Sequence, residues 1–312
     1  MNSIGNKFRI SIAGESHSSA ITVMIDGVPG GLKLDHDLIT TALRQRTPNI
    51  KGTTTRKDAT IPMILSGIKE DYTTGTPICA VFENNDAHNG YDPFVHGFRP
   101  SSADYTQSVK YGLHANLISA GHASGRLTVA LVYAGAIAKQ VLNHYLPSYT
   151  VSTFIDVNQD RLKRAIETGD SVSGLVRATA TGIPAGLGEP FFDSVESRIA
   201  QLAFSIPAVK QISFGNWMHK PEIFGSEYND ESQLDNWDGG IQGGITNGRP
   251  LDCEIWVKPT PSIAKSQIVN GKEMKITGRN DNCIALRVPI ILESIINIAI
   301  LDFYLMNVKP IE

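Results

Sequence analysis

The same order of turn motifs and predicted elements occurs twice in the sequence, and this repeat constrains the fold more than any other feature. The turn Gly27–Leu32 (GVPGGL) matches Gly182–Leu187 (GIPAGL), and each precedes a predicted helix. Three further pairs follow in the same order: Ile64–Gly67 with Ile212–Gly215, Gly75–Ile78 with Gly248–Leu251, and Gly125-Arg126 with Gly278-Arg279. Common turn residues can coincide by chance, but four ordered matches at offsets near half the chain favour duplication. We therefore expect one domain, residues 1–312, made of two pseudo-symmetric halves (about 1–148 and 149–312), with a site where equivalent loops meet.

Hydrophobic periodicity gives each half the same predicted elements. The first half has predicted strands at 8–13, 21–26, 61–67 and 76–82 and an amphipathic helix at His36–Arg46. The second half has predicted strands at 149–155, 175–181, 209–214 and 251–257 and a helix at 193–204. A long apolar helix closes each half, at 125–146 and 289–306. The polar stretch 83–124 has little periodicity and is predicted to be a long functional loop.

Composition excludes several classes of protein. The apolar runs are too short to span a bilayer, and the N-terminus lacks the apolar core of a signal peptide. The three cysteines (Cys79, Cys253 and Cys283) are isolated and show no metal spacing. A net charge of −3 gives no reason to expect a nucleic acid or a membrane as partner. We expect a soluble cytoplasmic protein without a structural metal.

The residues that can carry chemistry stand in loops rather than on elements. His17 sits in the bend Gly14–Ala20 between two predicted strands, and several arginines lie in loops of small residues. Guanidinium groups in such loops suit phosphate or carboxylate recognition. The alternatives are a hydrogen-bonded turn histidine and solvated surface arginines. No P-loop, dinucleotide fingerprint, serine nucleophile elbow or zinc motif is present. From the residues alone we expect a soluble, duplicated α+β protein with an Arg/His/Asp-lined site for an anion.

Taken together, these motifs resemble those of the chorismate synthase family along essentially the whole chain. The matching motifs of the first half are Gly14–His17, Asp26–Leu32, Ile64–Gly67, Thr74–Ile78, Asn84–Asp86, Arg99-Pro100 with Ala103–Tyr105, Lys110–Gly112, Gly121-His122, Ser124–Thr128 and Ala134–Lys139. Those of the second half are Gly182–Pro190, Ile206–Lys210, Gly239–Gly244, Lys258–Thr260 and Gly278-Arg279.

The resemblance implies a fold and an activity. The fold would be an internally duplicated β-α-β sandwich of the α+β class, usually assembled as a homotetramer. The activity would be a carbon–oxygen lyase reaction, the 1,4-anti elimination of phosphate from 5-enolpyruvylshikimate 3-phosphate to give chorismate in aromatic amino-acid biosynthesis. The cofactor would be reduced FMN, with NADP also associated with the family, and the partner a small phosphorylated substrate.

The resemblance also assigns roles to residues. His17 would protonate the departing phosphate, and Asp281 would help the flavin N5 accept the substrate's proton. The implied cofactor contacts are Ser124, Arg126, Asn247, Gly248, Lys258, Ser262 and Arg279. The implied substrate contacts are Arg46, Arg56 and Arg99.

The sequence departs from the family pattern at the second catalytic position. The family keeps a histidine in Arg-Pro-Gly-His-Ala-Asp-Tyr, and this chain has Ser102 there. Serine cannot hold a positive charge beside the flavin N1. Asn280 replaces another family histidine, and Ser119 and Ala120 replace two glycines. These departures leave open an impaired or repurposed homologue that still binds flavin or phosphate, and a structural protein on the same scaffold.

Overall fold

The computed structural model describes residues 2–47, 50–54, 61–84, 91–216, 219–220, 222–229, 235–269, 271–276 and 280–307. Two of the predicted site residues, Arg56 and Arg279, lie outside this set.

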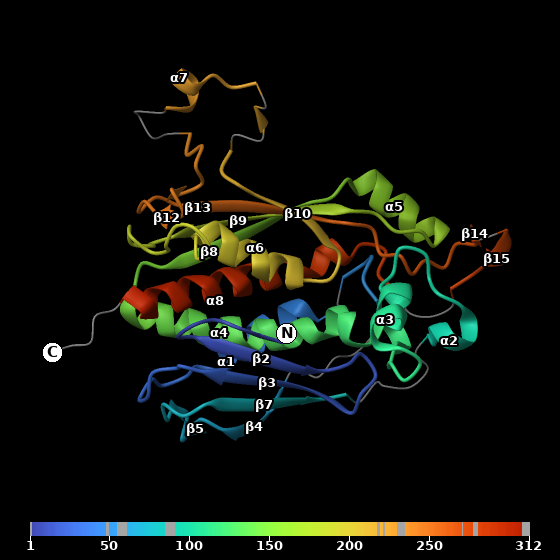
Figure 1. Ribbon diagram of the computed structural model, residues 1–312, viewed down its shortest axis with the longest axis horizontal. Helices are drawn as coiled ribbons and strands as arrows, with labels where there is room; N and C mark the ends of the chain where they lie inside the picture. The colour runs from blue at the N-terminus through green and yellow to red at the C-terminus, as the bar shows by residue number, and fades with distance from the viewer. Residues whose placement is uncertain are drawn as a thin grey trace.

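Two antiparallel sheets enclose a layer of helices (Figure 1). The first sheet has the order β1-β2-β3-β7-β4, built from β1 (Ser3–Ile4), β2 (Arg9–Gly14), β3 (Ala20–Asp26), β7 (Ile78–Glu83) and β4 (Met63–Ser66). The second has the order β10-β13-β9-β8, built from β10 (Val209–Phe214), β13 (Leu251–Val257), β9 (Gly174–Thr181) and β8 (Thr150–Asp156). Between them lie α4 (Thr128–Tyr145) and α8 (Pro289–Asn307), with α1 (His36–Arg46) and α6 (Val195–Ser205) alongside.

Four strands of the first sheet correspond in order to the four strands of the second, and β1 has no counterpart. Read from its far edge, the first sheet runs β4-β7-β3-β2, which matches β10-β13-β9-β8 in the second. The helices correspond as well, α1 to α6 and α4 to α8, in the same chain order. The α+β class and the sandwich predicted from the sequence are confirmed by this architecture.

The central helices are buried because they are apolar on all sides. Most of α4 and α8 is inaccessible to solvent, as expected for a helix with no polar face. They pack closely at Gly135, where an added Cβ would stand 2.4 Å from the Cβ of Ser294. By length and composition α8 is long enough to cross a membrane, but 67% of that stretch is buried inside the protein. It is therefore better explained as a core helix than as a membrane span.

Several elements were not predicted. The stretch 83–124, taken as one long loop, contains α2 (Pro93–His96), α3 (Asp104–Tyr111) and the short 3₁₀ segment η1 (Ile118–Ala123). α5 (Gln159–Thr168) was also missed, although its ends carry ordinary signals. The Asn158 side chain accepts from Arg161 N, and Gly169 ends the helix with φ 68°. The remaining small pieces are β5 (Ile68–Lys69), β6 (Tyr72–Thr73), η2 (Gly125–Leu127), α7 (Gly225–Tyr228), β11 (Ile241–Gln242), β12 (Ile245–Thr246), β14 (Gln267–Val269), β15 (Lys272–Met274) and η4 (Ile284–Arg287).

Candidate functional site

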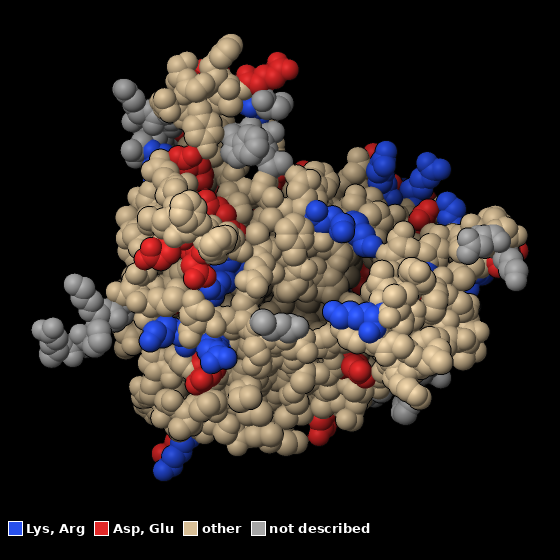
Figure 2. Space-filling view, viewed as in Figure 1, with Lys and Arg blue, Asp and Glu red and all other residues tan. Residues whose placement is uncertain are grey.

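A cavity of about 820 Å³ opens where the two halves of the chain meet. Its walls come from the N-terminal segment, β2, the loop before α3, the start of α4, the end of α6 and the chain after β13. Figure 2 shows a hollow on this face between the second sheet and α3, with Lys and Arg side chains at its edge. The polar lining residues include Arg99, Ser101, Ser102, His122, Ser124, Lys258, Thr260 and Ser262, and the apolar ones include Ile4, Ile10, Ile12, Leu127 and Leu131. The volume and the mixed lining suit a cofactor-sized ligand.

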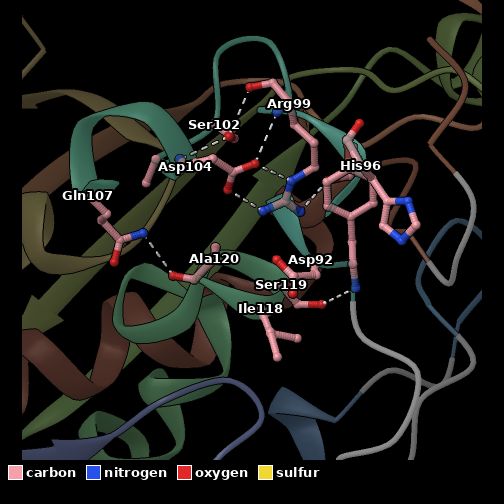
Figure 3. Close-up of polar contacts among 12 residues, drawn as sticks. Asp92, His96, Arg99, Ser102, Asp104, Gln107, Ile118, Ser119 and Ala120 are labelled. Carbon is pink, nitrogen blue, oxygen red and sulfur yellow. Dashed lines mark hydrogen bonds and ion pairs between the residues drawn. The ribbon is translucent and has the colours of Figure 1, made fainter. Parts of the chain in front are cut away.

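Arg99 and Asp104 form a buried ion pair, called the clamp below, at the N-terminus of α3 (Figure 3). Asp104 is inaccessible to solvent and accepts from Arg99 Nε at 2.8 Å, Nη2 at 2.6 Å and the backbone N at 3.0 Å. The third side-chain bond of Arg99 runs from Nη1 to Ser262 Oγ at 2.9 Å. Three of the five guanidinium donors are therefore engaged within the protein. Arg99 lines the cavity as predicted, but its main visible role is to join α3 to the chain after β13.

Ser102 and Lys258 lie together on the cavity wall. The Ser102 hydroxyl donates to Arg99 O at 2.9 Å and accepts from Asp104 N at 3.1 Å, so it shapes the turn into α3. Lys258 Nζ donates to the carbonyl of Ser101 at 2.6 Å. Burial, and secondly the charge of Lys210, lowers the pKa of Lys258 from its ordinary value. An ammonium group that is partly desolvated in this way favours an anionic partner.

The segment η1 carries three successive residues with positive φ: Ser119 at 49°, Ala120 at 74° and Gly121 at 48°. At the first two of these positions, Ser119 and Ala120, the sequence departs from the family's glycines. Ser119 Oγ accepts from Tyr91 N at 3.2 Å, and Ala120 O accepts from Gln107 Nε2 at 3.1 Å (Figure 3). The surrounding bonds hold a backbone that a non-glycine residue disfavours.

The bend that carries His17 is held from several sides. Asn84 Nδ2 donates to the carbonyls of Ser16 and Ser18, at 2.9 and 2.8 Å, and Arg126 Nη1 donates to Ser16 O. His122, on the cavity wall, donates from Nδ1 to Gly14 O at 2.8 Å. Arg126 is thus brought to the bend that carries His17, through the Ser16 carbonyl. Neither His17 nor Arg126 is among the residues lining the cavity.

Asp281 and Arg46 both lie beside Arg287. Asp281 Oδ1 accepts from Thr54 N at 2.9 Å, and its Oδ2 lies 3.4 Å from Arg287 Nη1. Arg287 Nε also donates to the carbonyl of Arg46 at 3.1 Å. A small void lined by Arg46 and Arg287 shares Gly125 with the main cavity, so the cluster lies just behind its wall.

The structure therefore brings some predicted residues together and separates others. Ser102, Ser124, Lys258, Ser262 and Arg99 line one cavity. Arg46 with Asp281, and His17 with Arg126, form two groups connected to it through the segment 121–128.

Asn247 and Gly248, predicted to contact the same cofactor as Lys258, do not line the main cavity. They precede β13 and Lys258 follows it, so a seven-residue strand, about 20 Å long, separates them. The Asn247 side chain instead accepts from Arg249 N at 3.0 Å. The glycine-rich motif before this turn, Gly239–Gly244, contributes to the β11–β12 hairpin.

Sequence reasoning missed the roles of Asp104, His122 and Arg287. A buried acid five residues after Arg99 is a usable signal for an ion pair, but one that many surface pairs also show. His122 and Arg287 make contacts with residues more than 100 positions away, Gly14 and Arg46. Spacing along the chain carries no information about such contacts. No group of three metal-ligating side chains occurs among the described residues.

Comparison with known proteins gives a consistent result. A family model described as chorismate synthase matches residues 8–159 and 152–305. The chain is 43% identical over 327 residues to chorismate synthase of Chitinophaga pinensis, covering 98% of this chain and 97% of that one. It is 37% identical over 345 residues to chorismate synthase of Syntrophus aciditrophicus, covering 97% of each. A solved structure titled "Crystal Structure of Chorismate Synthase" matches in fold, with a TM-score of 0.75 at 24% identity over 97% of this chain and 93% of that one. None of these comparisons supports the alternative of an impaired or repurposed homologue.

Proposed function

This chain belongs to the chorismate synthase family, and from that premise we propose that it eliminates phosphate from 5-enolpyruvylshikimate 3-phosphate with reduced FMN held in the main cavity. The observation that carries the proposal is the match along the whole chain, together with a cavity that gathers Ser102, Ser124, Lys258 and Ser262. These residues come from both halves of the sequence.

The cavity lining fits a reduced flavin. Ile10, Ile12 and Leu131 offer an apolar wall for a planar ring system, while Lys258 and several hydroxyl groups offer polar contacts. When bound, reduced FMN would supply an electron transiently as phosphate leaves and recover it afterwards. Lys258 would orient the cofactor and offset its negative charge, because its ammonium lies on the wall with the pKa lowered by burial.

Of the neighbouring arginines, Arg46 is a proposed substrate contact and Arg126 a proposed cofactor contact. Arg46 is 2% exposed and Arg126 is 9% exposed. A buried guanidinium group pairs strongly with phosphate or carboxylate. Arg126 contacts the bend through the Ser16 carbonyl, and Arg46 lines the small void next to the main cavity. His17 would donate the proton that helps the phosphate leave, since its bend is fixed by Asn84 and Arg126. Asp281, held by Thr54 N and Arg287, would keep a carboxylate near the proton that the ring loses. Arg56 and Arg279 remain predicted contacts outside the described residues.

Anaerobic turnover tests the proposal. The purified chain, reduced FMN and 5-enolpyruvylshikimate 3-phosphate should yield chorismate, measured by its ultraviolet absorbance. No product above the enzyme-free control would refute the activity. Lys258→Met should weaken FMN binding, because it removes the cation on the cavity wall. Lys163→Met, on the exposed face of α5, is the matched control and should leave FMN binding unchanged.

Ser102 gives a second test. Its side chain already lines the cavity, so Ser102→His would place an imidazole on the same wall. A general acid or charge at that place is worth roughly 10²–10⁴-fold in rate. An increased turnover would show that the serine limits this enzyme. An unchanged turnover would mean that other groups on the cavity wall already supply the proton or the positive charge.

We also propose a cytoplasmic homotetramer, with NADP as a nucleotide to test. The outer faces of both sheets expose apolar side chains: Met24 and Met63 on the first sheet and Phe154 and Trp256 on the second. Exposed apolar sheet faces are typical of subunit interfaces. The division into halves at about residue 148 is likewise proposed, on the matching strand orders. Light scattering after gel filtration measures the assembly, and a monomer would contradict it.

A further inference from the structure

A second cavity, of about 630 Å³, lies at the free edge of the second sheet, beside α7. The first turn of α6, the edge strand β10 and the turn before β11 form its walls. Its lining residues are Glu196, Ile212, Ser213, Phe214, Tyr228, Trp237, Asp238, Ile241, Gln242 and Gly243. None of them lines the main cavity, and none belongs to the proposed catalytic machinery.

Three polar atoms on these walls are buried and have no hydrogen-bond partner in the described part of the chain: Trp237 Nε1, Ser213 Oγ and Glu196 Oε2. The residues Trp237 and Ser213 are only 6% and 8% exposed, so solvent reaches them little. Buried polar groups are normally paired, and leaving one unpaired costs stability. Three such atoms around one cavity point to a ligand that completes them.

Tyr228, Asp238 and Gln242, which also line the cavity, are bonded to one another. Asp238 Oδ1 accepts from the Tyr228 hydroxyl at 2.5 Å, and Oδ2 accepts from Gln242 Nε2 at 2.7 Å. Burial, and then the hydrogen bond to Asp238, raises the pKa of Tyr228 to about 12, so the phenol remains a donor. The carboxylate of Asp238 thus adds negative charge to the wall. Figure 2 shows acidic side chains gathered on this face below α7.

The unpaired atoms define the chemistry of the ligand. The Glu196 carboxylate accepts hydrogen bonds and pairs best with a cationic donor. The indole N–H of Trp237 is a donor only, so its partner must be an acceptor. The Ser213 hydroxyl serves either. Phe214, Ile212 and Ile241 supply an apolar surface beside them. A ligand complementary to all of these groups has an ammonium group, a nearby carbonyl or carboxylate oxygen and an apolar side chain.

We propose that this second cavity binds a small primary ammonium compound with an adjacent acceptor oxygen and an apolar side chain, which is the chemistry of an apolar α-amino acid or its amide. The ammonium group pairs with Glu196, the acceptor oxygen receives the Trp237 N–H and the Ser213 hydroxyl, and the side chain packs on Phe214. The site is distinct from the catalytic cavity, so occupancy does not require FMN or substrate.

Isothermal titration calorimetry on the full-length protein tests this with three probes. L-phenylalaninamide carries the ammonium and a neutral acceptor, L-phenylalanine carries the ammonium and a carboxylate, and 3-phenylpropionate lacks the ammonium. We expect saturable binding of at least one of the first two and none of the third. Glu196→Gln should raise the dissociation constant about tenfold or more, because a charge-assisted bond is lost. Glu167→Gln, an exposed acid on α5, is the control and should bind as the unaltered protein does.

Ser213→Ala gives an independent variant that tests the acceptor side, and it should weaken binding as well. Circular dichroism establishes that each variant is folded before titration. The proposal is overturned if no ammonium probe binds saturably, if 3-phenylpropionate binds as tightly as the amide, or if Glu196→Gln and Ser213→Ala both bind with unchanged affinity.

Discussion

Replacing Asp104 by Asn should destabilise the protein strongly although it hardly changes the side chain's shape. Asp104 is fully buried and accepts three hydrogen bonds from Arg99, two of them from the guanidinium group. The amide presents a donor where one carboxylate oxygen accepted, and it leaves the buried guanidinium without a counter-charge. Breaking a buried ion pair on one side costs about 3–5 kcal/mol. Since Asn retains one acceptor oxygen, we expect the lower end, about 3 kcal/mol.

That figure can be converted to a melting temperature. At about 2.1 cal/mol/K per residue, the entropy of unfolding of a 312-residue chain is roughly 650 cal/mol/K, so 3 kcal/mol lowers the Tm by about 5 °C. Urea unfolding followed by circular dichroism measures the loss of free energy, and a thermal scan measures the Tm. The matched control is Asp193→Asn, because Asp193 also pairs with an arginine, Arg198, at 2.9 Å but is 52% exposed. An exposed pair contributes no more than about 1 kcal/mol.

The same variant separates two roles for Arg99. If Arg99 mainly bound the substrate, removing the competing carboxylate would free its guanidinium and tighten the binding of an anion. The structure predicts the opposite, because the clamp also holds Ser262 through Arg99 Nη1. FMN or phosphate affinity should therefore fall in Asp104→Asn. Equal stability losses in the two asparagine variants, or a tighter anion complex, would refute this reasoning.

Three further predictions follow from individual residues. Ala120→Gly should stabilise the protein by about 1 kcal/mol in urea unfolding because Ala120 has φ 74°, whereas Ala136→Gly inside α4 should destabilise it by a similar amount; a loss in both would remove the strain argument. His17→Ala should reduce turnover by roughly 10²–10⁴-fold with an unchanged Tm, and full activity would return His17 to a turn residue. Because burial lowers the pKa of Lys258, its neutral form favours folding: that contribution is present above the ordinary value of 10.5 and is lost as the pH falls through the lowered pKa. Lys258→Met should therefore flatten the rise of stability with pH in that alkaline range, measured by thermal scans, and an unchanged slope would contradict the assignment.

The sequence predicted the repeated elements well because each has a strong local signal. The strands 209–214 and 251–257 and the helix His36–Arg46 have the predicted bounds, and the ends of the two long helices differ by only a few residues. These elements alternate or repeat apolar residues in a regular way and are bounded by Gly or Pro. α3 lacks such a signal. Its N-cap residue, Ala103, makes no side-chain cap bond, and the Asp104 side chain is bonded to Arg99. The contact at the start of α3 therefore comes from Arg99, which lies outside the helix, and the pattern of the helix residues does not show it.

The structure gathers the predicted site residues only in part, for a related reason. Of the predicted cofactor contacts, Ser124 and Lys258 line the main cavity. Asn247 does not line it, and its motif gives no information about which end of β13 faces the cavity. Side chains paired across the fold, such as Arg287 with the Arg46 carbonyl, could be found only in three dimensions.

The main cavity lies at a place where the two halves of the chain carry different elements. In the first half the chain between β7 and α4 carries α2, α3 and η1; in the second half the chain between β13 and α8 carries β14, β15 and η4. These insertions occupy equivalent places in the repeat, and each sends side chains to the same cavity, Arg99 and Ser102 from one and Lys258 and Ser262 from the other. The hydrogen bond from Arg99 to Ser262 joins them directly. Side chains from two different stretches give the cavity an asymmetric lining, which suits an asymmetric ligand. On the proposed division into two halves, the shared elements supply the paired core, and the chemistry depends on the two stretches in which the halves differ.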